Sequence, residues 1–284
     1  AAATAAFTIV PRHVLGGPGF TAPSDMVNVA GIGLGNQGGS DIRNIATPDV
    51  PITGRRGLPG MKFYRYPGPR PERRRAAPRA SDNPNQMGAA GGDKTFKHAN
   101  IYALCDVDSE YAGHMFAGYP KAKVYDDFRK MIDKEKELDA VVIGTPDHTH
   151  AVIAAYAMNA GLHVFVEKPM AKTIHEVRFL KELAKKTGLV TQMGNQGHNI
   201  EGTMQTVEWI QSGAIGDVRE VKMWSNRPVW AQGPLDRPAG VDVPKNLNYD
   251  VWLGPAPEKP YHPDTTHFAW RGLWDYGTGA MGDM

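Results

Sequence analysis

A lysine that directly follows an apolar run is the first candidate for chemistry in this chain. The stretch His163–Met170 reads HVFVEKPM and runs from apolar and β-branched residues into Glu167, Lys168 and Pro169. Ligands of α/β folds bind at the carboxyl ends of the strands, so a lysine placed there could bind a hydroxyl group or exchange a proton with it. A solvated lysine at a strand end is the alternative, and Lys168 alone does not decide between the two.

A glycine pattern near the start of the chain could bind the pyrophosphate of a dinucleotide. The apolar run Met26–Gly33 is followed by a helical pattern, and Gly33, Gly35 and Gly38 between them fit G-x-G-x-x-G. The first glycine permits a tight turn, the second lets the backbone approach the phosphates, and the third lets the helix pack on the strand. A single match is weak in a chain with 32 glycines, and its place between strand and helix favours a dinucleotide. The other candidate contacts in this turn are Leu34, Asn36 and Gln37.

An acidic residue that binds the ribose is expected after the next strand, about 20 residues further on. It is delayed by the segment 47–99, which is rich in Pro, Gly and Arg and predicts a surface insertion. Ile101–Leu104 then reads as a strand, and Asp106 is the candidate ribose acid. Its carboxylate would repel a 2′-phosphate, which favours NAD over NADP. Alternatively, Asp106 and Asp108 cap a helix that begins near Ser109.

Polar residues also follow the buried strand predicted over Leu138–Ile143. They form the segment 144–150, GTPDHTH, and an Ala-rich helix is predicted after it. His148 and His150 could suggest a metal pair, but no cysteine or closely spaced third ligand supports one, so we expect no metal. A capping box at Thr173 then predicts a helix that runs to Thr187.

The composition is that of a globular chain, with 284 residues of which 41% are hydrophobic. The net charge of +2 is too small to indicate nucleic acid, although the segment 51–98 holds 11 basic residues against 3 acidic ones. We expect this basic run to be a solvated loop, with contact to a phosphate or an acidic partner as the alternative. A single cysteine, Cys105, excludes an internal disulfide framework, and no apolar run reaches the roughly 18 to 20 residues of a membrane span.

The last third of the chain differs from the rest in its residue pattern and its aromatic content. The helix predicted over 201–212 has an apolar face, and Val218–Trp224 alternates as a half-exposed strand does. The segment 228–284 is rich in aromatic rings with polar tips, which suit a carbohydrate, although packing in a core explains any one ring equally well. The candidate substrate-binding residues here are Tyr261, His262, Trp270 and Arg271.

Taken together, the ordered motifs resemble the Gfo/Idh/MocA family of NAD(P)-dependent oxidoreductases. The motifs are the glycine pattern at 33–38, the Cys-Asp pair at 105–106, TPDHTH at 145–150 and Glu-Lys-Pro at 167–169. Each motif alone is weak, but the ordered set is specific and spans the chain from about residue 25 to its last residue. The segments 252–257 and 270–272 are similar to an exported bacterial subgroup of the family.

The resemblance implies a two-domain α/β enzyme. Residues 25–195 would form a Rossmann domain with a doubly wound parallel sheet, and residues 196–284 an incomplete α+β substrate domain with an open sheet that mediates homo-oligomers. Residues 1–24 would be an N-terminal arm or the remnant of a signal peptide. The subgroup implies export to the periplasm by the twin-arginine route, although the arginine pair of such a signal is not in this chain; a cytoplasmic enzyme is the alternative.

The resemblance also implies roles for single residues. Lys168 would be the acid/base or bind the reacting hydroxyl, and Asp283 matches the first residue of a second catalytic signature, whose histidine would lie past the last residue. We therefore expect this chain to bind NAD yet turn over slowly or not at all. The implied cofactor contacts are Thr145, Pro146, His150, Glu167, Lys168 and Asn195 or Gln196.

The expected function is hydride transfer between nicotinamide and a hydroxyl-bearing carbon of a sugar, polyol or glycoside. A glycosidase that uses NAD to oxidise the sugar transiently is an alternative within the family. A non-catalytic protein that binds sugar or nucleotide in the same pocket is an alternative from another class. The expected partner is a small carbohydrate, with no nucleic acid and no membrane span.

Overall fold

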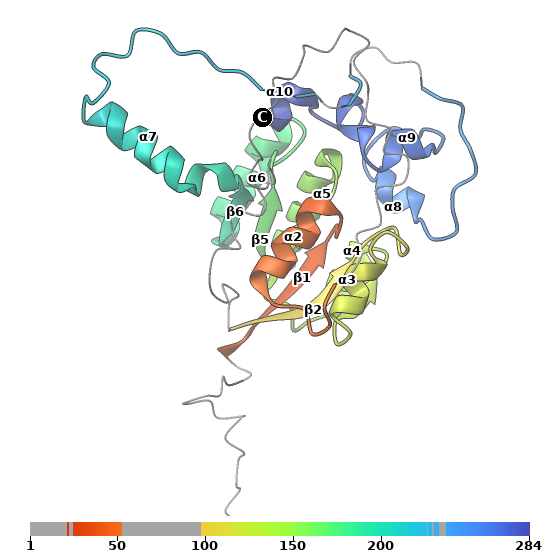
Figure 1. The fold of residues 1–284 in the computed structure, drawn as a ribbon. Helices are drawn as coiled ribbons and strands as arrows, with labels where there is room; N and C mark the ends of the chain where they lie inside the picture. The colour runs from red at the N-terminus through yellow and green to blue at the C-terminus, as the bar shows by residue number, and fades with distance from the viewer. Residues whose placement is uncertain (1–21, 23–24, 53–97, 226, 229, 233–236) are drawn as a thin grey trace, which may run out of the picture.

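The computed structural model describes residues 22, 25–52, 98–225, 227–228, 230–232 and 237–284 (Figure 1). Its centre is a parallel sheet with the strand order β3-β2-β1-β4-β5-β6, which confirms the predicted doubly wound α/β fold. Nearly all of the predicted signal remnant and most of the basic insertion lie outside the described residues. The strands are β1 (Val27–Ile32), β2 (Ala99–Cys105), β3 (Lys123–Tyr125), β4 (Ala140–Ile143), β5 (His163–Glu167) and β6 (Thr191–Gly194).

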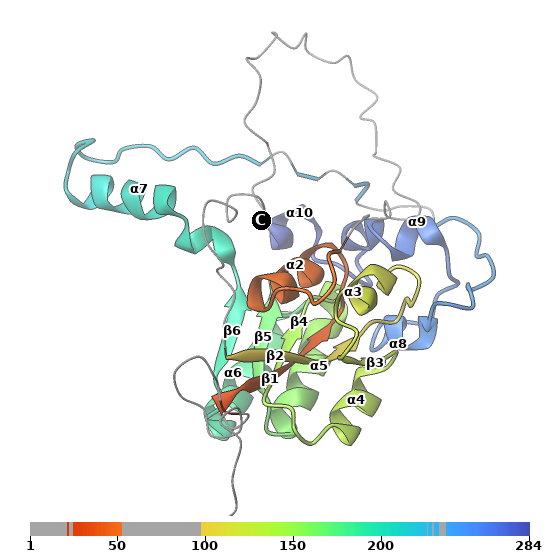
Figure 2. The same cartoon turned by 60° about the horizontal axis from the view of Figure 1, so that its bottom comes forward.

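Helices cover both faces of this sheet. In Figure 2, α2 and α3 lie on one face, and α4, α5 and α6 on the other. Each face buries its own apolar cluster, one around Ile42 and Met115 and one around Met131, Ile153 and Leu180. Full burial of one such side chain contributes about 1.5–3 kcal/mol, so these clusters hold the strand ends in place. The helices are α2 (Asn36–Ile45), α3 (Gly113–Gly118), α4 (Phe128–Lys134), α5 (Asp147–Asn159) and α6 (Ile174–Thr187).

The ends of α6 lie where the sequence predicts them, whereas α5 begins earlier than predicted. The predicted capping box of α6 is present, and the helix ends at Gly188 with a φ of 68°. In α5 the helix begins at Asp147, so the prediction that polar residues as far as His150 precede it was wrong. Pro146 is extended and directly precedes the helix. Asp147, the acidic residue of the first turn, suits the positive end of the helix dipole.

The C-terminal part of the chain packs short helices over the carboxyl ends of the strands. Trp252, Leu253, Leu273 and Tyr276 form a small apolar cluster there. The helix α7 instead projects away from the sheet (Figure 1), and none of its residues is buried. These elements are η3 (Gln196–Asn199), α7 (Glu201–Gln211), α8 (Tyr249–Leu253), α9 (Pro263–Thr266), η4 (Ala269–Gly272) and α10 (Gly279–Asp283).

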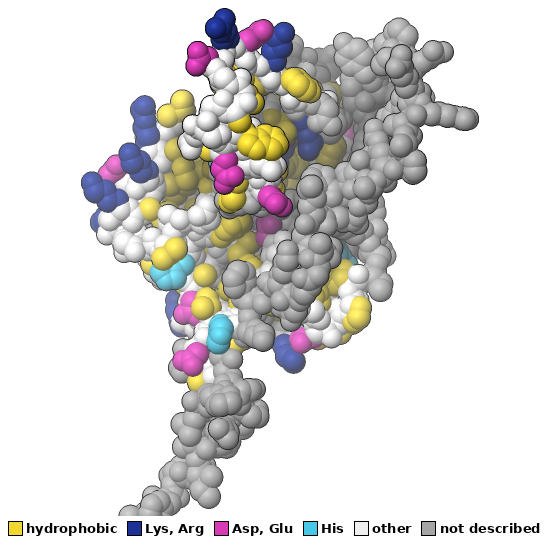
Figure 3. Space-filling view, turned by 60° about the vertical axis from the view of Figure 1, so that its left-hand side comes forward, with side chains coloured by type: hydrophobic (Ala, Val, Ile, Leu, Met, Phe, Trp, Pro, Cys, Tyr) yellow, Lys and Arg dark blue, Asp and Glu magenta, His cyan; other side chains and the backbone are white. Residues whose placement is uncertain are grey.

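The strand predicted over Val218–Trp224 does not form. The segment has no regular structure, and Trp224 is 88% exposed. A strand needs a neighbour for its N–H and C=O groups, and after residue 194 the described residues make only a single bridge, between Leu247 and Asp108. Figure 3 looks onto this side of the molecule, where hydrophobic side chains are open to view among charged ones. No described helix is both long enough and apolar enough to cross a bilayer.

Candidate cofactor and active site

A cavity of about 300 Å³ lies at the carboxyl ends of the strands. It joins residues that follow four strands: Gly33 after β1, Asp106 after β2, Thr145 after β4 and Lys168 after β5. The strand order reverses between β1 and β4, and this is the point of an open α/β sheet where ligands bind. Of the predicted site residues, the cavity is lined by Gly33, Gly35, Asn36, Gln37, Asp106, Thr145, Pro146, His150, Glu167, Lys168, Trp270, Arg271 and Asp283.

The glycine turn has the geometry of a phosphate cradle. Gly33 has a φ of +78°, which favours glycine, and a Cβ atom on Gly38 would lie 2.0 Å from the carbonyl oxygen of Gly33. Gly38 is therefore a packing residue beneath the cavity. Gly35 stands at the N-cap of α2, where no side chain caps the helix, and a helix N-terminus attracts anions. The turn fits the pyrophosphate of a dinucleotide.

Asp106 lies beside this turn. One of its carboxylate oxygens accepts a hydrogen bond from the backbone N–H of Leu34 at 2.6 Å, and the other accepts from Asp108 at 3.0 Å. Burial raises the pKa of Asp106 to about 6, against the opposing effect of these two bonds, so the carboxylate is mostly ionised at neutral pH. The side chain of Leu34 is buried in the core, which leaves its backbone to the turn. Asp108 caps the following turn through the N–H groups of Glu110 and Tyr111, so the capping role falls to this second aspartate.

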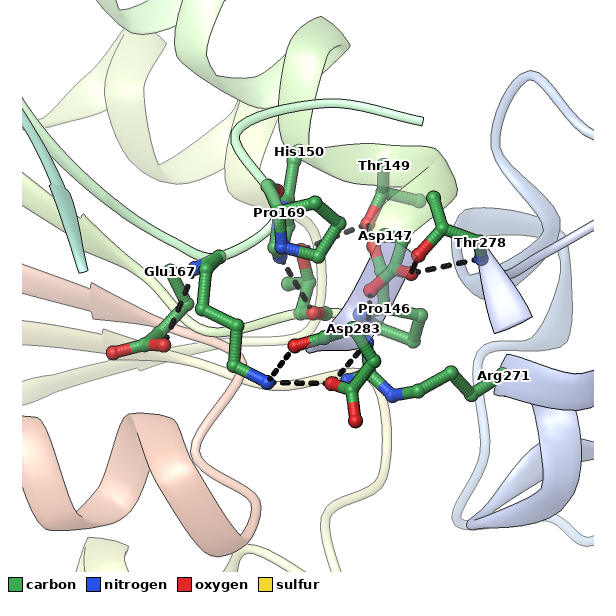
Figure 4. A network of polar contacts seen from close by, with 11 residues as sticks. Pro146, Asp147, Thr149, His150, Glu167, Pro169, Arg271, Thr278 and Asp283 are labelled. Carbon is green, nitrogen blue, oxygen red and sulfur yellow. Dashed lines mark hydrogen bonds and ion pairs between the residues drawn. The ribbon is translucent and has the colours of Figure 1, made fainter. Parts of the chain in front are cut away.

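Lys168 is held by a residue from the far end of the chain, Asp283, which Figure 4 shows beside Arg271. Its Nζ atom lies 2.5 Å from Oδ1 of Asp283 and 3.1 Å from the Asp283 carbonyl oxygen. The same Oδ1 atom is 3.2 Å from Nη1 of Arg271. Arg271 in turn donates to Asp147 at 2.8 Å, and Thr278 donates to the other oxygen of this buried carboxylate. Asp147 therefore fixes the arginine that shares Asp283 with Lys168.

Glu167 connects the lysine to the other side of the cavity. It is buried, and it accepts from the backbone N–H of Lys168 at 3.2 Å and from the side chain of Gln196. On α2, the buried Asp41 has its pKa raised to about 8, first by burial and then by the charge of Glu167. Gln196 thus binds the Glu167 carboxylate without lining the cavity. Asn195 is not among the described residues that line the cavity either.

The two histidines of the segment 144–150 bind backbone carbonyl groups. The ring of His150 has Nδ1 at 2.7 Å from the Pro169 oxygen and Nε2 at 2.8 Å from the Thr145 oxygen, which ties together the loops after β4 and β5. His148 has Nε2 at 2.9 Å from the Trp252 oxygen, and burial lowers its pKa to about 4. Within the described part of the chain, no three His, Cys, Asp or Glu side chains are grouped to hold a metal ion.

Aromatic residues form one wall of the cavity. Trp230, Trp252, Phe268 and Trp270 line it. Two of the predicted substrate-binding residues, Trp270 and Arg271, lie here, and the guanidinium of Arg271 stacks on the Trp270 ring at 4.4 Å.

The other two predicted substrate-binding residues lie elsewhere in the described chain. Tyr261 is buried against Tyr249, with ring centroids 5.4 Å apart, and it does not line the cavity. His262 caps α9 by accepting from the N–H of Asp264 at 3.1 Å. The sequence did not single out Asp41, Asp147, Arg227, Trp230 or Thr278 as site residues, although Asp147 lies in the polar segment 144–150 and Trp230 in the aromatic-rich segment. In the sequence, an acidic residue at the start of a helix is explained by the helix dipole alone. No neighbouring residue shows that a distant arginine binds it.

Comparison with known proteins decides the family. Residues 85–195 match the family model described as oxidoreductase family, NAD-binding Rossmann fold, and residues 223–284 match the one described as oxidoreductase family, C-terminal alpha/beta domain. The chain belongs to the Gfo/Idh/MocA oxidoreductase family. NAD is the cofactor of this family's Rossmann domain, and the glycine turn and Asp106 fit it. The turn itself precedes the first matched residue, so its place in the site rests on the geometry.

Curated relatives in the Gfo/Idh/MocA family include dehydrogenases of cyclic alcohols. The 1-carboxy-3-chloro-3,4-dihydroxycyclohexa-1,5-diene dehydrogenase of Comamonas testosteroni is 33% identical over 123 residues, which are 43% of this chain and 31% of that protein. The inositol 2-dehydrogenase of Salmonella paratyphi B is 31% identical over 138 residues, which are 46% of this chain and 41% of that protein. The matches thus span less than half the length of these relatives.

Solved structures with a similar fold include two inositol dehydrogenases. The myo-inositol 2-dehydrogenase of Lactobacillus plantarum has 22% identity and a TM-score of 0.47, and the match covers 68% of this chain and 43% of that chain. The scyllo-inositol dehydrogenase of Lactobacillus casei, solved with NAD(H) and scyllo-inositol, has 21% identity, the same TM-score of 0.47 and the same coverage of 68% and 43%.

Proposed function

We propose that this chain belongs to an enzyme that transfers a hydride between NAD and a hydroxyl-bearing carbon of a sugar, polyol or glycoside. The observation that carries this proposal is that Lys168 lines the same cavity as the glycine turn and Asp106. Relatives named inositol 2-dehydrogenase and levoglucosan dehydrogenase support a polyol or sugar as substrate. When bound, NAD supplies the ring that exchanges the hydride.

Lys168 is the base that takes up the hydroxyl proton. A hydride leaves a carbinol carbon as the hydroxyl proton is taken up, so the site needs a base next to that oxygen. The neutral amine of Lys168 takes the proton at Nζ, and the carboxylate of Asp283 at 2.5 Å stabilises the ammonium group that results. An ammonium group has three N–H bonds. Among the described residues, Asp283 supplies both acceptors of Nζ, which leaves one N–H for the substrate oxygen.

Asp106 selects the form of the cofactor. As an ionised carboxylate it accepts a hydrogen bond from a ribose 2′-OH and repels a 2′-phosphate. The hydrogen bond from the Leu34 N–H group fixes the position of Asp106. Its carboxylate cannot rotate away from the glycine turn without losing that bond. We therefore propose NAD rather than NADP as the cofactor of this enzyme.

Substitution of Lys168 by Ala tests the function. General acid–base catalysis contributes typically 10²- to 10⁴-fold, so we expect a loss of about that size in the rate at which the enzyme that contains this chain forms NADH with sugars and polyols. The affinity for NADH, measured by its fluorescence enhancement, should change little. Lys172→Ala is the matched control because Lys172 does not line the cavity. Wild-type rates in the Lys168 variant would refute the role of the lysine, and a wild-type chain that binds no NADH would refute the proposed function.

Export by the twin-arginine route, homo-oligomer formation and the domain boundaries near residues 25 and 195 stay predictions from the sequence. Free NAD is scarce outside the cytoplasm. We therefore propose that the exported, folded protein carries its NAD tightly bound. Nucleotide absorbance released by denaturing the protein purified from the periplasm tests this, and its absence would count against it.

A further inference from the structure

One of the three cations that line the cavity has no counter-charge among the described residues. Lys168 lies 2.5 Å from Asp283, and Arg271 lies 2.8 Å from Asp147. Arg227 is the third, and no described carboxylate lies within ion-pair distance of it, although it lines the cavity and is exposed. A protein that neutralises two of three neighbouring cations with its own acids leaves the third for the ligand or for solvent.

The position of Arg227 is set by Trp230. The guanidinium lies over the indole ring, with its central carbon 5.3 Å from the ring centroid. Such stacking uses the flat face of the guanidinium and leaves its N–H edge free for a planar anion. Trp230 itself is 5% exposed, and its indole N–H has no acceptor among the described residues. Trp230 is thus a buried ring that fixes the guanidinium, and the accessible donors at this wall are the N–H groups of Arg227.

This wall belongs to the reacting side of the cavity. The guanidinium of Arg271 lies 6.0 Å from the centroid of the same Trp230 ring, and its Nη1 atom is 3.2 Å from Asp283, the partner of Lys168. Arg227 is therefore linked to the lysine that takes the hydroxyl proton through Trp230, Arg271 and Asp283. The pyrophosphate cradle lies on other elements, at the start of α2.

We infer that Arg227 binds a carboxylate of the substrate, so that the substrate class is a sugar acid or a cyclitol acid rather than a neutral sugar. The inference rests on the proposed function and adds the anionic group. A carboxylate matches the two parallel N–H bonds of a guanidinium edge, and its two oxygens supply acceptors to the N–H groups of Arg227. The lysine then acts on a hydroxyl of the same molecule.

Paired probes that differ in one carboxylate test the inference. We would titrate D-glucuronate against D-glucose, and D-galacturonate against D-galactose, into the protein with and without saturating NADH, by calorimetry. A charge-assisted hydrogen bond implies that each acid binds about 10- to 100-fold more tightly than its neutral partner. Because Arg227 is exposed, this preference should shrink as the ionic strength rises.

Two variants and a control identify the residue. Arg227→Gln should lose the preference for acids and its salt dependence, with unchanged affinities for neutral sugars and NADH. Arg227→Lys keeps the charge and should retain part of the preference. Lys172→Gln removes an equal charge from a cation that lies over Trp274, at 5.7 Å and away from the cavity lining, and should behave as wild type.

Three results would overturn the inference: a wild-type chain that binds neither acid more tightly than its neutral partner, a preference that survives in Arg227→Gln, or a loss of NADH affinity in that variant. A chain that binds no NADH would refute the proposed function instead, and the titrations without NADH would still decide the role of Arg227.

Discussion

The Nζ atom of Lys168 lies 2.5 Å from Oδ1 of Asp283, and the two residues are 115 positions apart in the sequence. The side chain of Asp283 is 3% exposed, whereas that of Lys168 is 37% exposed. The lysine therefore faces the cavity while its counter-ion is enclosed by the C-terminal segment. Arg271 shares the same carboxylate oxygen at 3.2 Å. The surroundings of Lys168 are thus completed by helices that follow the Rossmann sheet.

Replacement of Asp283 by Asn keeps the shape and removes the charge. In the enzyme that contains this chain, we expect the catalytic rate constant kcat to fall about 10-fold or more, because the ammonium form of Lys168 loses its counter-ion, with little change in NADH affinity. The free energy of unfolding should fall by about 1–2 kcal/mol, since Lys168 is partly solvated and Arg271 keeps Asp147. Asp275→Asn breaks an Arg–Asp pair outside the cavity and should leave kcat unchanged. An Asp283 variant with wild-type turnover would contradict this role.

The third glycine of the turn should tolerate no side chain. A Cβ atom at position 38 would lie 2.0 Å from the Gly33 oxygen, so in Gly38→Ala the helix must move away from the strand. Such overpacking costs about 1–3 kcal/mol, and we expect weaker NADH binding in fluorescence titrations together with a lower melting temperature. Gly113→Ala is the control, because nothing lies within 4 Å of its Cβ position. Unchanged NADH affinity in Gly38→Ala would show that the turn does not cradle the cofactor.

The parts of the fold that sequence predicts well are those decided within a few residues. The capping box at Thr173 and the left-handed Gly188 set the ends of α6, and both are readable from side chains four residues or fewer from the terminus that they define. The ends of the parallel strands are predictable for the same reason. Because such strands end at one edge of the sheet, the order of the motifs along the chain is enough to bring Gly33, Asp106 and Lys168 together.

The parts that sequence could not predict depend on distant partners. Asp147 reads as an acid at a helix start, but its oxygens are bound by Arg271 and Thr278, the latter 131 positions away. Val218–Trp224 alternates as a strand does, yet alternation does not supply a neighbouring strand, and the segment stays irregular. Tyr261 was predicted to contact substrate only because it lies in an aromatic-rich segment. The composition of that segment does not show that the Tyr261 ring is buried against Tyr249.

Asp106 should control the choice between NADH and NADPH. In Asp106→Ser the acceptor for the ribose and the charge that repels a 2′-phosphate are both lost, so we expect the ratio of NADPH to NADH affinity to rise about 10-fold or more. The pKa of Asp106 is raised to about 6, so wild-type NADH affinity should fall as the pH drops through that value and the carboxylate becomes protonated. The variant should lack this step. Asp250→Ser removes an exposed charge on α8 and is the control. A wild-type cofactor ratio in the Asp106 variant would contradict the assignment.

His148 should make the docking of the C-terminal segment sensitive to pH. Burial lowers its pKa from 6.5 to about 4, so the folded protein binds fewer protons at this site than the unfolded chain between these values. Its contribution to stability, about 3 kcal/mol, is therefore present above pH 6.5 and is lost as the pH falls toward 4. Asp41 and Asp106, whose pKa values are raised, act in the opposite direction, so only the difference between variant and wild type isolates the histidine.

His148→Gln isolates that contribution, because a glutamine can donate to the Trp252 oxygen and does not titrate. We expect urea unfolding of the wild type to lose stability relative to this variant between about pH 7 and about pH 5. His175→Gln, at an exposed position on α6, should follow the wild type at every pH. If the difference between wild type and His148→Gln stays constant over this range, the buried histidine is not the group that couples protonation to the docking of the C-terminal segment.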